Sequence, residues 1–371
     1  MQFGLTETQQ VLKNSARAFF PAECPIAEVR RLMETETAFD AALWKKIADQ
    51  GWCGIIFPEE YDGLGLGMVE LAAAMEEMGR ALVPGPFLAG LLAGAILNAA
   101  ANPDQKIRYL APLCRGEKKS TLALLESSAR WDAAAVQMKA LEGKKMFVPD
   151  AGVADFLIVA ARTGPNLALF AVDSKARGIR IQPSPAMDLT RKLYEVTFTG
   201  VQGELLASGA AAESALSNAL DIATVALVAE MTGGMQKVLD TTVEYAKTRK
   251  QFGKPIGQFQ AVQMHCADML VLTESSRSAA YYAAYAVQNR LPEARVAVSI
   301  AKAYASDAYR EVGNKGIQCH GGMGFTWEND LHLYYRRAKA SELAFGDAIY
   351  HRERIARLVI DQPHALAAEN R

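Results

Sequence analysis

A stretch just past the middle of the chain combines residue types that suit a planar anion. It reads RKQFGKPIGQFQ, from Arg249 to Gln260, and follows a long helical pattern. Arg249 and Lys250 can meet phosphate groups through charge-assisted hydrogen bonds. Phe252 offers a flat apolar face, and Gln251 or Gln260 can donate and accept hydrogen bonds with a heterocycle. The stretch therefore predicts either a site for an anionic, ring-bearing ligand or a basic turn between two packed helices.

A second cluster, rich in glycine, lies at the end of a later helical pattern. It reads QCHGGMGFT, from Gln318 to Thr326. Gly321 and Gly322 would let the backbone approach a ligand closely, and Gln318 lies at the mouth of the turn. A helix C-cap followed by a turn would also explain the glycines. Both interpretations stay open on this cluster alone.

Helical patterns must position these motifs, and the first of them begins near the N-terminus. From Thr6 to about Gly116 the apolar residues recur with a helical period, and Thr6 with Gln9 could form a capping pair. One predicted helix covers 68–82 and places four apolar side chains on one face, Leu71, Met75, Met78 and Leu82.

Short apolar or alternating runs, separated by turn residues, begin near Ser120. They predict strands at 120–125, 145–148, 156–161, 167–172, 179–182 and 194–198. From about Ala207 the helical period returns, through 219–248, 259–289 and 293–317. Because predicted helices and predicted strands occupy separate parts of the chain, the sequence indicates an α+β chain with separate domains rather than a doubly wound sheet. We expect an N-terminal helical domain, a small antiparallel β domain and a C-terminal helical domain, at 1–118, 119–207 and 208–371.

The composition is that of an ordinary soluble globular protein, half apolar with 22% charged residues. The net charge of −1 gives no bulk attraction to nucleic acid or to an anionic membrane. The first residues carry no cationic region followed by an apolar one, and no uninterrupted apolar run reaches about 18 residues. The cysteines and histidines show neither zinc spacing nor a disulfide framework. We therefore expect a cytoplasmic protein with reduced thiols and no metal.

Taken together, the order of the elements and the two motifs resemble the acyl-CoA dehydrogenase family. The resemblance covers nearly the whole chain. The early loop FPEEYDGLGLG is similar to the PEEYGGLG-type loop of that family, and LEGKKMFVPDAGVADFLIVAA is similar to its pair of strands beside the flavin. Either late motif alone is moderately specific, and the two together are highly specific.

The resemblance implies a fold of two α-helical domains flanking the β domain, the last like a four-helix bundle. It also implies a dimer of dimers with FAD across a subunit interface. In the family, an R-x-x-F element, a later Gln and a Q-x-x-G-G turn hold the diphosphate and adenosine end of the FAD whose flavin ring lies in the neighbouring subunit. By match, six residues inherit this role in trans: Arg249, Phe252, Gln260, Gln318, Gly321 and Gly322.

The family removes two hydrogens from an acyl-CoA thioester: a carboxylate takes the α-proton while the β-hydrogen leaves as hydride to the flavin. The usual carboxylate is a Glu after an R-x-A-K element, and here that spacing reaches Phe345, which cannot take a proton. A second position, used by a minority of the family, falls at about Ala223. Asp347 is then the candidate catalytic base, with Glu342 second. A helix cap at Asp347 and a solvated Glu342 are the alternative interpretations.

The flavin side departs from the family at two places. The T-E-P-x-x-G-S-D stretch of the family matches 125–132, LESSARWD, only weakly. Its W-I-T element reads Phe147-Val148-Pro149. Pro149 offers neither a hydroxyl nor an N–H, whereas Phe147 can still stack on the cofactor. The side that would bind the flavin thus lacks several residues of the family pattern, whereas the residues matched to the adenosine end are all present.

Three functions remain open. The favoured one is a subunit of an FAD-dependent acyl-CoA dehydrogenase that completes the FAD site of a partner, in a tetramer with a second, similar chain. The alternative is a self-sufficient acyl-CoA dehydrogenase, a homo-oligomer with its base moved to Asp347 or Glu342. The third, from another class, is a non-catalytic scaffold protein that has lost FAD.

Overall fold

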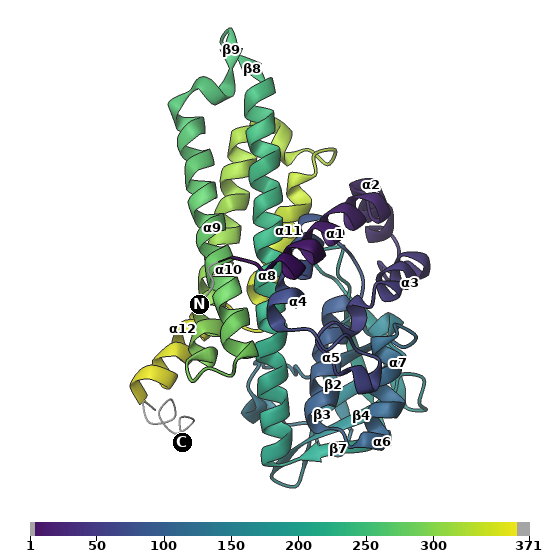
Figure 1. Ribbon diagram of the computed structural model, residues 1–371. Helices are drawn as coiled ribbons and strands as arrows, with labels where there is room; N and C mark the ends of the chain where they lie inside the picture. Colours follow the sequence, from purple (N-terminus) through teal and green to yellow (C-terminus); the bar gives the residue numbers. More distant parts are fainter. Residues whose placement is uncertain (1–3, 362–371) are drawn as a thin grey trace. The chain divides into compact units, whose positions relative to one another are not determined.

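The computed structural model describes residues 4–361, which divide into two compact units (Figure 1). Unit 2 contains the two larger sheets and combines residues 28–67 and 84–223. The long helix α8 (Ala210–Thr248) contributes to both units. The domain boundaries after 118 and 207 stay predictions. Unit 1 combines the described residues 4–27, 68–83 and 224–361.

Unit 1 is built from long helices and carries a small β-hairpin at one end (Figure 1). The predicted four-helix-bundle-like part is confirmed by α8, α9 (Gln260–Gln288), α10 (Ala294–His320) and α11 (Leu331–Leu343). The other elements of this unit are α1 (Glu7–Glu23), α4 (Met68–Arg80), α12 (Ala348–Ala356), η6 (Ile256–Gln258), η7 (Gly321–Phe325), η8 (Arg357–Asp361) and the hairpin strands β8 (Lys250–Gln251) and β9 (Lys254–Pro255).

The predicted capping pair begins α1. The Thr6 hydroxyl accepts from the backbone N–H of Gln9 at 3.3 Å, and the Gln9 side chain accepts from the backbone N–H of Thr6 at 2.9 Å. These bonds satisfy two donors that a helix start otherwise leaves open. The predicted helix at 68–82 ends earlier, at Arg80, because Leu82 adopts a left-handed backbone with φ 52°. All four apolar residues of its predicted face are nevertheless buried.

Glycines let α4 and α8 pack with their backbones in contact. A Cβ at Gly79 would lie 1.9 Å from the carbonyl oxygen of Glu230, and one at Gly233 would lie 1.7 Å from that of Glu76. Both distances are far inside van der Waals contact, so no side chain fits at either position. Two glycines that weaken their helices by propensity are therefore required by the packing of unit 1.

Unit 2 places two sheets beside short helices. The sheet orders are β1-β3-β4-β7 and β2-β6-β5. The strands are β1 (Ser120–Ala123), β2 (Gly143–Pro149), β3 (Phe156–Thr163), β4 (Asn166–Asp173), β5 (Ile179–Ser184), β6 (Leu193–Phe198) and β7 (Glu204–Ser208). The helical elements are α2 (Ile26–Met33), whose first residues belong to unit 1, α3 (Ala41–Asp49), α5 (Phe87–Ala100), α6 (Pro103–Gln105), α7 (Ala111–Cys114) and the short turns η1 (Trp52–Gly54), η2 (Glu59–Tyr61), η3 (Lys106–Leu110), η4 (Ala133–Ala135) and η5 (Ala151–Val153).

The order of helices, strands and helices is confirmed, with two corrections in the sheets. β1 pairs with β3 in parallel, so the β region is not purely antiparallel. The connection between these strands contains β2, which belongs to the other sheet, and this crossover makes a parallel pairing possible. The second correction is β7, a strand that sequence reasoning did not predict, although most of it lies within the β domain expected at 119–207. It pairs antiparallel with β4, directly before α8.

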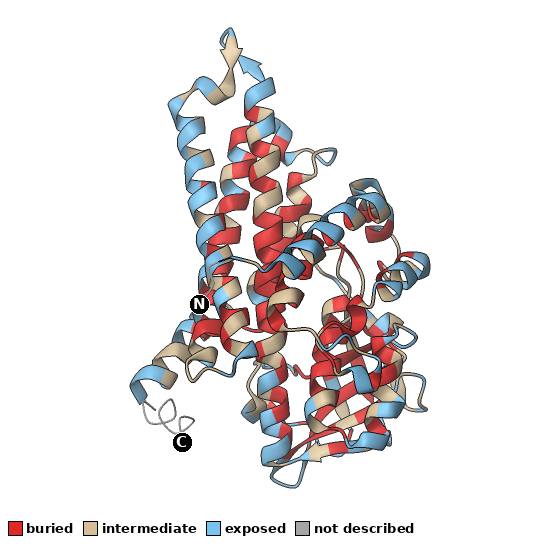
Figure 2. Ribbon diagram, in the orientation of Figure 1, coloured by how far each residue is buried: buried red, intermediate tan, exposed pale blue. Residues whose placement is uncertain are grey.

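The core of unit 2 explains its strand patterns. β3 is buried from Phe156 to Ala161, whereas β6 alternates between buried and partly exposed residues (Figure 2). A continuous apolar run marks a strand covered on both faces, and alternation marks a strand with one solvated face. The core cluster joins both sheets and includes Leu141, Val148, Leu157, Val159, Val172, Val196 and Phe198.

Helix α8 is long and apolar enough to cross a membrane by length and composition alone. However, 78% of its most apolar 18-residue window is buried inside the protein. Burial against other helices, as Figure 2 shows along its middle, is what a core helix of a soluble fold requires.

Candidate functional site

The stretch from Arg249 to Gln260 forms a β-hairpin between α8 and α9. Lys250 pairs with Pro255 and Gln251 with Lys254, and the two tip residues, Phe252 and Gly253, have φ of 53° and 79°. Two left-handed residues at the tip are typical of a type I′ hairpin. A phenylalanine is costly in this conformation, and here its side chain is 91% exposed. Such strain combined with exposure favours a binding role for the tip.

Sequence reasoning expected a helix, a shaped turn and a new helix at Phe259. The structure places Phe259 at the N-cap of α9. Its ring meets the Phe252 ring edge-on, with centroids 6.1 Å apart, and the Lys254 ammonium lies 4.5 Å from its centroid. These contacts hold the hairpin against the start of α9 while leaving the Phe252 face open.

The glycine cluster forms η7 at the end of α10. Gly321 has φ 59°, and a Cβ built at Gly321 or Gly322 would have no atom within 4 Å. By contrast, a Cβ at Gly324 would lie 2.8 Å from the carbonyl oxygen of Ile317. Packing therefore requires Gly324, whereas Gly322 is not explained by internal contacts. An open backbone at Gly321 and Gly322 suits close approach of a ligand.

The hairpin and the turn lie at the same end of unit 1. The Tyr245 ring on α8 stacks on the His320 ring at the end of α10, with centroids 4.1 Å apart and an interplanar angle of 19°. Arg249 follows one turn after Tyr245 and donates its backbone N–H to the Tyr245 carbonyl at 2.8 Å. Two motifs that are distant in the sequence are thus brought together.

This end of unit 1 offers polar side chains without internal partners. Within residues 4–361, no hydrogen bond or ion pair engages the side chains of Arg249, Gln260 or Gln318, and all three are exposed. A guanidinium and two amides can bind a diphosphate and a heterocycle, and the exposed Phe252 ring can cover a flat base. The donor set therefore fits the diphosphate and adenosine half of a dinucleotide.

The β unit presents one aromatic side chain by means of a bulge. The register of β2 against β6 shifts between Lys145 and Val148, and Phe147 in this interval has φ 52° and is 42% exposed. A bulge turns a side chain out of the regular alternation. Phe147 is thereby held outward, which is compatible with its predicted stacking on a cofactor.

A buried lysine next to the bulge was missed by sequence reasoning. Lys145 is fully buried, and its ammonium donates to the Leu124 carbonyl at 3.0 Å and to the Glu126 carboxylate at 2.7 Å. Glu126 also accepts from the backbone N–H groups of Gln137 and Met138, at 3.1 and 3.0 Å. These bonds hold together the two ends of the loop at 127–136, which overlaps the weakly matched LESSARWD stretch at 125–132. Sequence reasoning placed Lys145 at the start of the strand predicted at 145–148, and because lysines are ordinarily exposed, no local signal marked its burial.

Replacing Lys145 with Met is expected to lower the free energy of unfolding by about 2 kcal/mol, because the Glu126 carboxylate loses its charged partner. Chemical denaturation would measure this change. We also expect faster trypsin cleavage after the exposed Arg130 in the loop. Lys144 on the same strand is the control, since it pairs with Glu195 at the surface and its replacement with Met should cost less than about 1 kcal/mol. Equal effects of both substitutions would contradict the assigned role of Lys145.

Known proteins resemble this chain over most of its length. Sequence profiles of the acyl-CoA dehydrogenase N-terminal and C-terminal domains match residues 6–117 and 213–360. The acyl-CoA dehydrogenase IpdE2 of Mycobacterium tuberculosis is 32% identical over 337 residues, 90% of this chain and 92% of the relative.

The chain belongs to the acyl-CoA dehydrogenase family. The family consists of FAD-dependent oxidoreductases that act on the CH–CH group of acyl-CoA thioesters, which confirms the predicted family, enzyme class and cofactor. Among solved structures, the ChsE4–ChsE5 complex of Mycobacterium tuberculosis matches with a TM-score of 0.89 and 27% identity, over 97% of this chain and 99% of the other. PigA with FAD and proline matches with a TM-score of 0.90 and 26% identity, over 97% and 99%.

The position that the sequence match assigned to the family's usual base holds a buried phenylalanine. Phe345 is buried, with φ 59°, and it is followed by Gly346 with φ 99°. The Lys302 ammonium donates to the carbonyls of Glu342 and Gly346 at 3.0 and 2.8 Å and to Ser306 Oγ at 3.0 Å. Burial lowers the pKa of Lys302 to about 7, although Asp347 and Glu342 act against this shift. The backbone carbonyls on both sides of Phe345 are thus held from within unit 1.

The two candidate carboxylates are both engaged in structural contacts. Asp347 is the N-cap of α12, and its carboxylate accepts from the backbone N–H of Tyr350 at 2.8 Å. Glu342 bridges two cations, Arg310 at 2.5 Å and Lys339 at 2.7 Å. Their roles as bases stay predictions, and the geometry matches the cap at Asp347 and an ion-pair role at Glu342 rather than a free base.

His351 on α12 makes this segment sensitive to pH. Its Nε2 donates to the Phe345 carbonyl at 3.0 Å, and burial together with the charges of Lys302 and Arg354 lowers the pKa of His351 to about 3. An unfolded histidine titrates near pH 6.5, so the unfolded chain binds a proton between about pH 6.5 and 3 that the folded chain does not. Stability therefore falls as the pH decreases through this window.

Between about pH 6.5 and 5.5 we expect His351 to account for a loss of about 1 kcal/mol in the free energy of unfolding. Urea denaturation at both pH values should show a loss that is smaller by about 1 kcal/mol in His351→Gln than in wild type. His332→Gln is the control and should keep the wild-type dependence. A loss that is unchanged in His351→Gln would refute this assignment.

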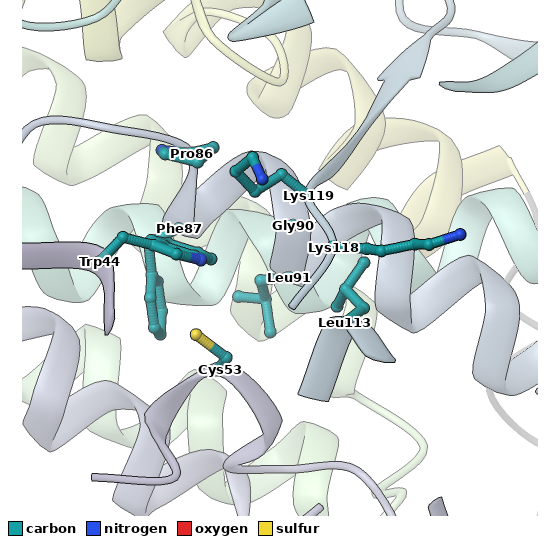
Figure 3. A pocket seen from close by; sticks show the side chains of 9 residues that line it. All are labelled: Trp44, Cys53, Pro86, Phe87, Gly90, Leu91, Leu113, Lys118 and Lys119. Carbon is teal, nitrogen blue, oxygen red and sulfur yellow. The ribbon is translucent and has the colours of Figure 1, made fainter. Parts of the chain in front are cut away.

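The small cavity in unit 2 does not serve an acyl chain. It has a free volume of about 10 Å³ and is lined by Trp44, Cys53, Phe87 and Leu91 among others (Figure 3). This volume is about that of one water position. Burial raises the pKa of the Cys53 thiol to about 12, so this thiol stays protonated at neutral pH.

Proposed function

We propose that this chain is a subunit of an FAD-dependent acyl-CoA dehydrogenase that completes the FAD site of a partner subunit. The contrast between two parts of unit 1 carries the proposal. The hairpin and turn expose unpartnered groups for a dinucleotide, whereas the usual base position holds a buried phenylalanine and both candidate carboxylates have structural partners. A chain of this kind supplies binding and positioning rather than proton abstraction.

FAD supplies the hydride acceptor of the reaction. In this chain, Arg249 would neutralise the diphosphate, and the amides of Gln260 and Gln318 would bind polar groups of the adenosine end. Phe252 would cover the adenine, with the open backbone of Gly321 and Gly322 allowing close approach. The exposed Phe147 of unit 2 would stack on a flavin ring.

The partner is proposed to be a second, similar chain, in a dimer of dimers located in the cytoplasm. The likeness to the ChsE4–ChsE5 complex supports a partnership of two related chains. The structural contacts of Asp347 and Glu342 also support it, since the general base of the dehydrogenation contributes roughly 10²–10⁴-fold to the rate. The partner would then provide the carboxylate that removes the α-proton.

The test compares the chain purified alone with the chain co-expressed with a related dehydrogenase chain of the same source. We expect acyl-CoA to bleach the flavin absorbance only of the co-expressed complex. Bleaching by the chain alone would instead support a self-sufficient dehydrogenase with Asp347 or Glu342 as base. Absence of flavin from both preparations would favour a scaffold protein that has lost FAD.

A further inference from the structure

A ring stack links the helices that carry the 249–260 hairpin and the 321–325 turn. Tyr245 lies on the last turns of α8, and its carbonyl accepts from the backbone N–H of Arg249 at 2.8 Å. His320 is the last residue of α10 and directly precedes Gly321. Their rings stack with centroids 4.1 Å apart. Any rotation of one ring therefore changes the position of one segment relative to the other.

The His320 ring is fixed by its own helix. Its Nδ1 lies 2.9 Å from the Gly316 carbonyl, and because a carbonyl only accepts, Nδ1 carries the proton. Burial lowers the pKa of His320, so the ring stays neutral at physiological pH. The ring orientation is then set by α10, and the stack passes that orientation on to α8.

Close packing of α8 against α10 prevents the two helices from sliding past each other next to the ring stack. A Cβ at Gly316 would lie 2.6 Å from Val238 Cγ1 and 3.3 Å from Thr242 Oγ1, so α8 and α10 are in close contact there. Helix α9, which follows the hairpin, also contacts α10, because the Lys315 ammonium lies 3.0 Å from the Asp268 carboxylate. Together with the ring stack, these contacts hold the two helices that flank the hairpin, α8 and α9, against α10.

We infer that Tyr245 and His320 are positioning residues: their stack aligns the 249–260 hairpin with the 321–325 turn so that both segments bind one dinucleotide. The inference rests on the proposed function for the identity of the ligand, FAD. Neither ring is required to touch the ligand. What the stack supplies is a fixed distance and angle between Arg249 on one side and the open glycine backbone on the other.

The experiment measures FAD binding by the full chain, in the assembly that binds FAD, for Tyr245→Ala, His320→Ala and the double variant. We expect each single variant to raise the Kd for FAD about 10-fold, since the interaction energy of an aromatic pair corresponds to about a tenfold change in an equilibrium constant. The double variant should bind no worse than either single one, because both remove the same contact. His320→Phe, which keeps a ring, should restore the Kd to within about 3-fold of wild type.

His332→Ala is the matched control. His332 also stacks on an aromatic ring, that of Trp327 at 4.8 Å, but this stack joins α11 to the residues just before it and includes no residue of α8. Its Kd should equal that of the wild type. Additive losses in the double variant would overturn the inference, as would a His320→Phe variant as weak as His320→Ala, which would make the imidazole nitrogen a direct ligand. Wild-type affinity in both single variants would also overturn it.

Amide hydrogen exchange of the chain without FAD separates this inference from the proposed function. In His320→Ala we expect faster amide exchange in both the hairpin and the turn, and unchanged exchange rates in α4 and α12. That result supports the alignment role even if the wild type binds no FAD, in which case the proposed function alone fails. Faster exchange confined to the turn would show a local role of His320 and overturn the alignment.

Discussion

Replacing Arg337 with Met is expected to lower the free energy of unfolding by about 3–5 kcal/mol. Arg337 on α11 is 1% exposed and forms an ion pair with Glu230 on α8, which is 3% exposed. The substitution leaves the Glu230 carboxylate buried without its charged partner. The desolvation cost of that carboxylate, rather than the lost attraction, makes the effect large.

Denaturation in urea would measure the loss. The double variant Glu230→Leu with Arg337→Met should recover most of it, because two apolar side chains of similar volume need no partner. Lys45→Met provides the control at an exposed pair, since Lys45 and Asp49 are 74% and 56% exposed and contribute less than about 1 kcal/mol. If Arg337→Met were as stable as Lys45→Met, the buried ion pair would not exist in solution.

The pair also matters for the site. α8 leads into the hairpin, and Arg337 belongs to the R-x-A-K element that precedes Phe345. An ion pair between these helices fixes the two segments on which the proposed function rests, namely the end of unit 1 with the hairpin and the segment that contains Phe345. We therefore expect the Glu230→Leu/Arg337→Met protein to retain FAD binding, since packing and not charge holds the helices in that variant.

Replacing Arg249 with Ala is expected to weaken FAD binding by roughly 10- to 100-fold, the value of a hydrogen-bonded charge pair. The structure gives this guanidinium no partner among residues 4–361, so its removal breaks no internal contact there. The melting temperature of the protein without FAD should therefore be unchanged. The flavin absorbance of the purified protein, relative to its protein absorbance, would report the loss of occupancy.

The control for this experiment is Arg290→Ala. Arg290 is also exposed, but it follows the far end of α9 and lies outside both motifs. Arg249→Lys should recover part of the affinity, because a lysine keeps the charge but not the paired hydrogen bonds. Unchanged FAD occupancy in Arg249→Ala would remove Arg249 from the proposed site.

The sequence by itself determined the order of the elements and the family. Helical and alternating periods reflect which faces are buried, and these periods are local enough to be read along the chain. The capping pair at Thr6 and Gln9 was predicted from residue types at a fixed spacing, and the new helix predicted at Phe259 begins one residue later. The two motifs around Arg249 and Gly321 were recognised because their residue types alone limit the ligands they suit.

Only the tertiary structure decided how those motifs meet and what surrounds the base position. The Tyr245–His320 stack and the burial of Lys302 and Arg337 depend on contacts between helices that are far apart in the sequence. β7 and the parallel pairing of β1 were missed because strand partners are set by the whole sheet and not by a local period. Sequence reasoning offered Asp347 both as a base and as a helix cap, and only the structure shows the cap contact, in which its carboxylate accepts from the backbone N–H of Tyr350 at the start of α12.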